Sequence, residues 1–272
     1  MSRLRQTLAE LAAREEGAFM PFLVVGDPNL QTSMRLTEAL VHAGSDILEF
    51  GFAFSDPPAD GPTIQAADQR ALASGITPEK AFEFLAEVQA RFQKPVALLM
   101  YFNLILQYGV DAFYARCAEV GVDAVLVADV PLEEGEPIVS AAEKYKVAPI
   151  FLVTELSDDA RIRRVAKHAS GYLYGITALG ITGGDAANIA SSPLQQTIDR
   201  VKKYTEVPVL AGFGISTPAH VQAVLQAGAA GAIVGSALVR QIELHLNDPE
   251  QMVQAVSKLA TSLKEATRKS VC

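Results

Sequence analysis

Two carboxylates stand close together where an apolar segment of the sequence gives way to a loop. Glu49 lies within the apolar run 46–51, and Asp60 lies in the loop 54–61 that follows it. If the run is a strand, the alternation of side chains places Glu49 on the same face as Ile47. Burial of a charge in such a run is unfavourable unless the charge is paired or used. One acid on a rigid strand and a second on a loop suit general acid–base chemistry.

Each of these acids also has a structural interpretation. Glu49 would then be a buried carboxylate paired with a neighbour, and Asp60 a residue that shapes a turn. Asp27 and Asp56 lie in turns rich in glycine and proline, where aspartate commonly bonds the local backbone, and we expect that role for Asp27. Asp129 follows the fourth apolar run and is a second-rank catalytic candidate.

The elements that must position these acids follow from the hydrophobic pattern. Eight short apolar runs recur along the chain, and most are nearly continuous, as in a parallel sheet covered on both faces. The predicted strands are 18–25, 46–51, 96–101, 124–128, 148–153, 172–176, 207–212 and 231–235. Amphipathic segments of helical period separate them. The predicted helices are 30–43, 78–91, 109–120, 133–145, 158–168, 193–204, 218–227 and 249–269.

Strict alternation of strand and helix predicts βαβ units around a parallel sheet. Eight such units within 272 residues most simply close into a (β/α)8 TIM barrel, an α/β fold, and the amphipathic segment 1–17 adds an N-terminal helix. A doubly wound open sheet is the alternative, but the first strand–helix turn, 25–28, lacks a dinucleotide-binding fingerprint. No linker divides the chain, so we expect one domain, 1–272. The active site of a barrel lies at the carboxyl ends of its strands.

Three glycine clusters follow the last three predicted strands, at 180–184, 212–216 and 235–236. Glycine lets backbone N–H groups approach an anion closely, and the last cluster opens a short apolar helix, 237–244. Because a helix N-terminus attracts anions, these clusters predict a phosphate site held mainly by backbone amides. The alternative is that the glycines only turn the chain.

Composition and charge narrow the function classes. The formal net charge is −8 with a pI near 5.1, which argues against nucleic acid as the main partner. No stretch reaches the ~20 apolar residues of a membrane span, and the N-terminus lacks the apolar block of a signal peptide. Cys117 and Cys272 are expected to be free thiols in a reducing cytoplasm, and a presequence already removed would instead allow a plastid.

Several kinds of catalysis find no suitable residues in the sequence. The lysines fall in predicted helices or just before strands, which argues against a Schiff base. The four histidines lie in helical patterns, as does Cys117, which argues against a catalytic metal and against a thiol nucleophile. No metal and no cofactor are therefore expected. Proton transfer by Glu49 and Asp60 beside a phosphate site remains.

The chain resembles the tryptophan synthase alpha subunit family over nearly its whole length. The most specific pieces are residues 49–51 and the acidic loop with its flank, 54–65. The other matching segments are 21–22, 26–28, 99–101 with Asn103, 128–131, 180–183, 212–216 and 235–237. The resemblance implies retro-aldol cleavage of indole-3-glycerol phosphate to indole and glyceraldehyde 3-phosphate, without a metal or cofactor. The two catalytic acids of the family correspond to Glu49 and Asp60.

The resemblance also implies a role for each residue of the site. Glu49, with a pKa raised by burial, is expected to shuttle protons between the hydroxyl group beside the ring and indole C3. Asp60 is expected to accept the indole N–H, stabilise the developing positive charge, and accept a hydrogen bond from Thr182 when its loop closes. The residues implied to line the indole pocket or lie near the substrate are Phe22, Leu99, Tyr101, Leu126 and Tyr174. Those implied to hold the phosphate are Gly183, Gly212, Phe213, Gly214, Gly235 and Ser236.

In this family the acidic loop, including Asp56, faces a beta subunit that condenses indole with serine using pyridoxal phosphate. The resemblance therefore implies an α2β2 heterotetramer in which indole passes through a tunnel. The chain departs from the family pattern at Val24, Ala53 and Pro58 and in the segment 177–179. Because these positions lie in a strand end and in loops that couple closure to the partner, they bear on activation rather than on the two acids.

Three other functions stay open from the sequence. One is a stand-alone lyase that releases free indole without a partner. A second is a barrel enzyme acting on another phosphorylated sugar, such as an isomerase of the histidine or tryptophan pathways, which an open sugar site in place of an indole pocket would distinguish. The third is an inactive homologue that only activates a beta subunit, and the intact Glu49, Asp60 and Thr182 disfavour it.

Overall fold

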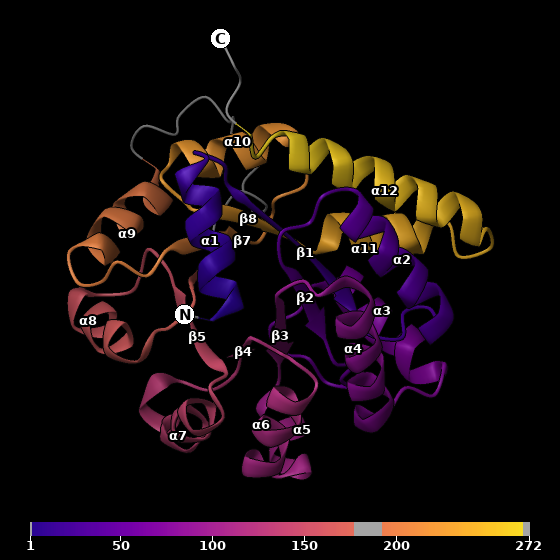
Figure 1. Cartoon of the computed structure of the whole chain (residues 1–272), viewed down its shortest axis with the longest axis horizontal. Coiled ribbons are helices and arrows are strands. Elements are labelled where there is room, and N and C mark those ends of the chain that lie inside the picture. The colour runs from indigo at the N-terminus through magenta and orange to yellow at the C-terminus, as the bar shows by residue number, and fades with distance from the viewer. Residues whose placement is uncertain (1, 177–191, 269–272) are drawn as a thin grey trace.

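The computed structural model describes residues 2–176 and 192–268. Within these residues the parallel strands form a closed barrel in chain order, and β1 pairs with both β2 and β8 (Figure 1). The predicted (β/α)8 barrel is confirmed, and the open doubly wound sheet is wrong because β1 closes on β8. The strands are β1 (Ala18–Val24), β2 (Leu48–Gly51), β3 (Val96–Met100), β4 (Ala124–Val127), β5 (Ala148–Val153), β6 (Leu173–Ile176), β7 (Val209–Gly212) and β8 (Gly231–Val234).

Helices surround the barrel on its outside (Figure 1). Two of them begin where the sequence predicted, at Pro78 and Pro218, because the side chains of Thr77 and Thr217 each accept a backbone N–H of the first turn. In the described residues no helix is long and apolar enough to cross a membrane. The helices are α1 (Arg3–Ala13), α2 (Leu30–His42), α3 (Pro62–Ala73), α4 (Pro78–Phe92), α5 (Phe102–Tyr108), α6 (Val110–Glu119), η1 (Leu132–Glu134), α7 (Glu136–Tyr145), α8 (Asp159–His168), α9 (Pro193–Lys202), α10 (Pro218–Gln226), α11 (Ser236–Leu244) and α12 (Pro249–Glu265).

Two helices, α3 and α5, were not predicted, and the predicted helix 133–145 begins later than expected. Its first residues form the 3-10 turn η1 instead, and α7 starts at Glu136 with a proline in its first turn. Proline favours that position because its missing N–H would have no partner there. The helix α3 matters for the site, because it follows the acidic loop directly.

The two faces of each strand pack into different layers. Ile47 of the β2 region packs with Tyr172 inside the barrel, whereas Phe50 packs outward, where its ring meets Phe84 of α4 edge to face at 5.7 Å between centroids. Alternation predicted that Glu49 shares a face with Ile47, and the structure places that face inside the barrel. A charged side chain on that face lies among apolar neighbours.

The N-terminal helix α1 closes one end of the barrel. Its residues Leu4, Leu8 and Leu11 are buried in the same cluster as the inward-facing side chains of the strands. Arg3 fixes the helix by an ion pair with Asp123, at 2.6 Å between Nη2 and Oδ2, just before β4 begins. The helix α1 therefore covers the end of the barrel where the strands begin.

Candidate active site

Glu49 is the buried acid at the centre of the site. It lies on β2 beside Phe22 of β1 and Ala97 of β3, and it is 1% exposed. Among the described residues, its Oε1 atom has no hydrogen-bond partner. Burial, and then the charge of Asp60, raises its pKa to about 8. The structural interpretation of Glu49 as a paired carboxylate therefore finds no support, and the side chain is a protonated acid at neutral pH.

Asp60 lies on the loop between β2 and α3. The hydroxyl group of Tyr101 donates to its Oδ2 atom at 2.7 Å, and Gln65 of α3 donates from Nε2 to its backbone oxygen at 2.8 Å. Burial raises the pKa of Asp60, and the hydrogen bond from Tyr101 lowers it. The loop acid is thus held at both its side chain and its backbone.

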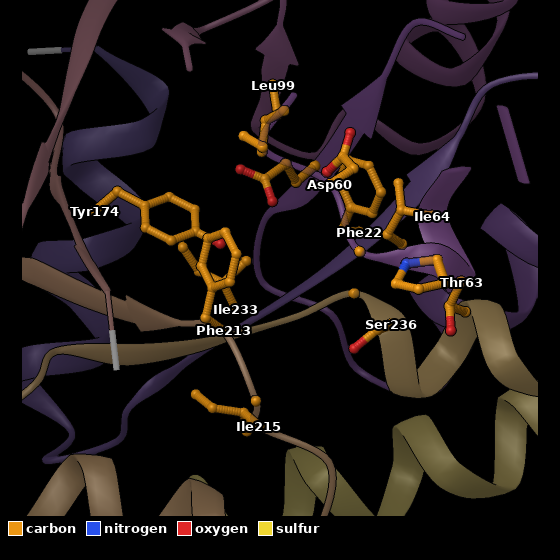
Figure 2. A pocket seen from close by; sticks show the side chains of 16 residues that line it. Phe22, Asp60, Thr63, Ile64, Leu99, Tyr174, Phe213, Ile215, Ile233 and Ser236 are labelled. Carbon is orange, nitrogen blue, oxygen red and sulfur yellow. The ribbon is translucent and has the colours of Figure 1, made fainter. Parts of the chain in front are cut away.

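Both acids line one cavity of about 550 Å³ at the carboxyl ends of the strands. Figure 2 shows Tyr174 and Phe213 on one side of this cavity and Asp60, Phe22 and Ile64 on the opposite side. The rings of Tyr174 and Phe213 meet edge to face at 6.1 Å between centroids. Leu99 and Ile233 add further apolar surface. The cavity therefore offers a flat apolar ligand an enclosed place beside two carboxyl groups.

The other end of the cavity is built from backbone rather than charged side chains. Gly214, Gly235 and Ser236 line it, and Ser236 is the first residue of α11. Phe213 and Gly214 both have positive φ angles, of 71° and 72°, which turn the chain after β7. The first N–H groups of a helix lack partners within the helix, so this end of the cavity favours an anion.

The structure brings together most of the residues that the sequence predicted for the site. Tyr101 reaches the site through its hydrogen bond to Asp60, while Leu126 packs in the barrel interior with Leu99 and Tyr174 rather than on the cavity wall. Thr182 and Gly183 lie outside the described residues, as does the segment 177–179. The predicted residues that line the cavity are Glu49, Asp60, Phe22, Leu99, Tyr174, Phe213, Gly214, Gly235 and Ser236.

Gly212 has a different environment from the one expected of a phosphate ligand. A Cβ atom built at this position would lie 2.3 Å from the hydroxyl oxygen of Tyr174, closer than any side chain tolerates. Gly212 is absent from the cavity wall, where Phe213 and Gly214 stand instead. Its lack of a side chain makes room for the Tyr174 ring, which does line the cavity.

Three other acids have the following positions. Asp27, expected to bond the local backbone, instead accepts two hydrogen bonds from Arg70 of α3, at 2.7 and 2.9 Å, and is 1% exposed. That expectation was wrong because the partner lies 43 positions away. Asp129 accepts the backbone N–H of Phe102 at 2.8 Å, which is a helix-capping contact of α5. Asp56 is exposed on the acidic loop.

Sequence reasoning missed part of the cavity wall. Thr63 and Ile64 belong to the first turn of the unpredicted helix α3, and Ile215 and Ile233 complete the apolar lining. The signal for α3 was Pro62 directly after Gly61, since proline is common at the first position of a helix. Ile233 could have been found from the alternation of β8, which directs every second side chain inward.

Comparison with known proteins identifies the family. The family model of the tryptophan synthase alpha chain matches residues 8–268. The tryptophan synthase alpha chain of Sodalis glossinidius is 50% identical over 98% of this chain and 100% of its own length, and that of Shigella sonnei is 48% identical over the same shares. The chain belongs to the tryptophan synthase alpha chain family.

Solved structures of tryptophan synthase share the barrel. The alpha chain from Legionella pneumophila subsp. pneumophila is 30% identical, covers 100% of this chain and 99% of its own, and has a TM-score of 0.89. A tryptophan synthase structure from M. tuberculosis in an aminoacrylate-bound form matches with 27% identity over 97% of this chain and 100% of the other, with a TM-score of 0.83. The fold of the tryptophan synthase alpha chain therefore extends over nearly all of this sequence.

Proposed function

We propose that this chain cleaves indole-3-glycerol phosphate into indole and glyceraldehyde 3-phosphate, with Glu49 and Asp60 as its catalytic acids. The observation that carries the proposal is one cavity that holds both carboxyl groups at its apolar end and a helix N-terminus at its other end. An indole ring, a glycerol chain and a phosphate follow one another in the substrate in the same order. Membership of the tryptophan synthase alpha chain family supports the same reaction.

Glu49 is the proton shuttle in this proposal. Its protonated carboxyl group donates a proton to indole C3, which gives an indolenine with a positive charge at the ring nitrogen. The resulting carboxylate then removes the proton of the hydroxyl group next to the ring. The carbon–carbon bond breaks, its electron pair returns to the ring, and the hydroxyl carbon becomes the aldehyde of glyceraldehyde 3-phosphate. The net change moves one proton, and a pKa of about 8 keeps the acid form ready at neutral pH.

Asp60 stabilises the intermediate in this proposal. Its carboxylate accepts the indole N–H and so opposes the positive charge that develops at the nitrogen. Tyr101 occupies Oδ2 of Asp60 at 2.7 Å, which leaves Oδ1 for the ring nitrogen. Thr182 is proposed to add a further hydrogen bond to Asp60 when its loop closes over the site.

The remaining site residues hold the two ends of the substrate. Apolar and aromatic side chains of the cavity enclose the ring, and backbone N–H groups around the start of α11 receive the phosphate. Two of the proposed residues act from behind the wall, since Leu126 supports Leu99 and Gly212 makes room for Tyr174. The residues proposed for the ring are Phe22, Leu99, Tyr101, Leu126 and Tyr174. Those proposed to contact the phosphate are Gly183, Phe213, Gly214, Gly235 and Ser236, whereas Gly212, which the resemblance also implied, is proposed to act through Tyr174 instead.

The partner we propose is a tryptophan synthase beta subunit in an α2β2 complex, with the exposed Asp56 at the interface. A cytoplasmic location is part of the same proposal and agrees with the free thiol of the buried Cys117. The alternative is a stand-alone lyase that releases free indole. The changed residues Ala53 and Pro58 in the acidic loop are the feature of this chain that bears on it.

The test measures indole release from indole-3-glycerol phosphate with and without a matched beta subunit. We expect slow release by the chain alone, a large increase with the partner, and loss of release in Glu49→Gln. Glu79→Gln, an exposed substitution on α4, is the matched control and should behave as the wild type. Full activity without a partner would favour the stand-alone lyase. No release under any condition would exclude the proposed reaction.

A further inference from the structure

Phe22 lies between two strand-end glycines. Its strand, β1, pairs with both β2 and β8, and a glycine stands at the carboxyl end of each of these neighbours. Gly51 is the last residue of β2, and Gly235 directly follows β8. Alternation along β2 places Gly51 on the inner face of the barrel with Glu49, which pairs in register with Phe22 of β1. The ring of Phe22 therefore has a glycine on each side.

The Phe22 ring occupies the space that a side chain at position 51 would need. A Cβ atom built at Gly51 would lie 2.8 Å from Cζ and 3.0 Å from Cε2 of Phe22, at the tip of the ring. A Cβ atom built at Gly235 would lie 3.3 Å from Cδ1 and 3.5 Å from Cβ of Phe22, at the base of the ring. Because protein interiors are close-packed, a Cβ atom at position 51 cannot coexist with the present place of the ring tip. Gly51 therefore limits the ring more than Gly235 does.

The backbone at position 51 does not itself require glycine. Gly51 does not share the positive φ angle of Gly26 and Gly214, so alanine can adopt its conformation. Glycine within a strand is unfavourable, because it loses more conformational freedom on folding than other residues and has no side chain to pack. The role that the structure shows for this glycine is the room that it leaves for the Phe22 ring.

Phe22 connects this packing to the cavity. Its side chain packs with Val24, Ile64 and other buried residues, and it also lines the cavity. Figure 2 shows Tyr174 on the opposite side of the cavity. Because the packed neighbours leave the ring little room, the cavity is the open side toward which the ring moves when a side chain is added at position 51. Such a change should narrow the space between Phe22 and Tyr174.

We infer that Gly51 is a specificity-determining residue: by leaving room for the tip of the Phe22 ring, it sets the width of the slot that receives the indole ring. The inference rests on the proposed function, in which the apolar end of the cavity encloses that ring. Gly51 is not part of the cavity wall, so it acts through Phe22. A side chain at position 51 should make the slot narrower. A smaller side chain at position 22 should make the slot wider and remove the effect of position 51.

The experiment measures the binding of indole and of indoles that carry one methyl group on the benzene ring. The chain contains no tryptophan, so the fluorescence of the added indole reports its binding directly. We expect Gly51→Ala to bind indole about tenfold more weakly than the wild type and to discriminate more strongly against the methylindoles. Phe22→Leu should shift the preference toward the methylindoles. In the Phe22→Leu background, Gly51→Ala should change the affinity for indole by less than about twofold, because the ring that transmits the effect is gone.

The matched control is Gly17→Ala, just before the other end of β1. A Cβ atom built there would overlap Cδ2 of Leu225, so this variant should lose stability by overpacking and keep the wild-type preference among indoles. The inference would be overturned if Gly51→Ala kept the wild-type preference, or if its effect were the same with and without the Phe22 ring.

Two further outcomes separate the inference from other failures. If Gly51→Ala does not fold, an unchanged preference in Phe22→Leu overturns the inference, and a shift toward the methylindoles supports it. A wild type that binds no indole would also overturn it. If the expected binding pattern is found but indole-3-glycerol phosphate is not cleaved, the proposed reaction fails and the role of Gly51 in ring binding stands.

Discussion

The hydroxyl group of Tyr101 donates to Oδ2 of Asp60 across 2.7 Å, and this contact ties the loop after β2 to the end of β3. The same hydrogen bond lowers the pKa of Asp60 against the effect of burial. Tyr101 therefore does two things for the loop acid, since it fixes the position of the carboxylate and favours its ionised form. A hydrogen bond to a charged group typically contributes about 1.5–3 kcal/mol.

Tyr101→Phe removes this hydroxyl group and keeps the ring that stacks on Phe54. We expect kcat/KM for indole release to fall about 10-fold to 100-fold, which is the kinetic equivalent of one hydrogen bond to a charge. Because the hydrogen bond lowers the pKa of Asp60, its loss should also move the acidic limb of the pH profile upward. Tyr145→Phe is the matched control, since Tyr145 donates to Asp111 at the same 2.7 Å on the outer helices. An unchanged acidic limb in Tyr101→Phe would contradict this role.

Glu49 should make the protein less stable as pH rises. In the unfolded chain its carboxyl group ionises near pH 4.5, whereas burial in the fold raises its pKa to about 8. Between these values the folded state holds the extra proton, so the free energy of unfolding falls with rising pH. The amide in Glu49→Gln does not titrate. The free energy of unfolding of this variant should therefore rise relative to that of the wild type across this window, by roughly 3 kcal/mol at pH 7.

Urea unfolding at pH 5 and pH 7.5 measures this difference. The gain of Glu49→Gln over the wild type should be larger at pH 7.5 than at pH 5. Glu79→Gln on the outside of α4 shows what removal of one exposed carboxylate does. An equal gain at both pH values would mean that Glu49 is ionised in the fold and lacks the acid form that the reaction needs.

The barrel could be predicted because its signals are local. Each strand is a short apolar run, and the caps of α4 and α10 are pairs of adjacent residues, Thr77 with Pro78 and Thr217 with Pro218. Simple alternation also predicted that Glu49 and Ile47 share a face, which the structure places inside the barrel. Such features need only neighbouring residues, and the structure confirmed them.

The missed features depend on tertiary contacts. The helix α3 buries the small residues Ala67 and Ala71 and the polar Asp68, so its apolar period is weak in the sequence. The pairing of Asp27 with Arg70 joins segments 43 residues apart. Only Pro62 after Gly61 marks the start of α3 in the sequence. No pattern within one segment could reveal the Asp27–Arg70 pair, because its two members come from different segments.

The ion pair between Asp27 and Arg70 should be important for stability. The Nε and Nη2 atoms of Arg70 donate to the carboxylate of Asp27, which is 1% exposed, so Arg70→Ala leaves a buried negative charge without this partner. Loss of one partner of such a pair typically destabilises by about 3–5 kcal/mol. Urea unfolding should show this loss, and Arg91→Ala, whose partner Glu87 is exposed, should change stability by less than about 0.5 kcal/mol. Equal effects of the two variants would mean that Asp27 is neutral in the fold.

Gly212→Ala should damage the site through Tyr174 rather than through the phosphate. The new Cβ atom would lie 2.3 Å from the Tyr174 hydroxyl oxygen and 2.5 Å from two ring atoms, so the ring must move away from its place beside Phe213. We expect a stability loss of about 1–3 kcal/mol, typical of overpacking, and a fall in kcat/KM because the cavity wall is displaced. Gly135→Ala is the control, because a Cβ atom built there lies 3.5 Å from its nearest neighbour, the backbone oxygen of Leu132. It should leave stability and kcat/KM unchanged. If Gly212→Ala kept wild-type stability and only weakened inhibition by inorganic phosphate, Gly212 would be a phosphate ligand after all.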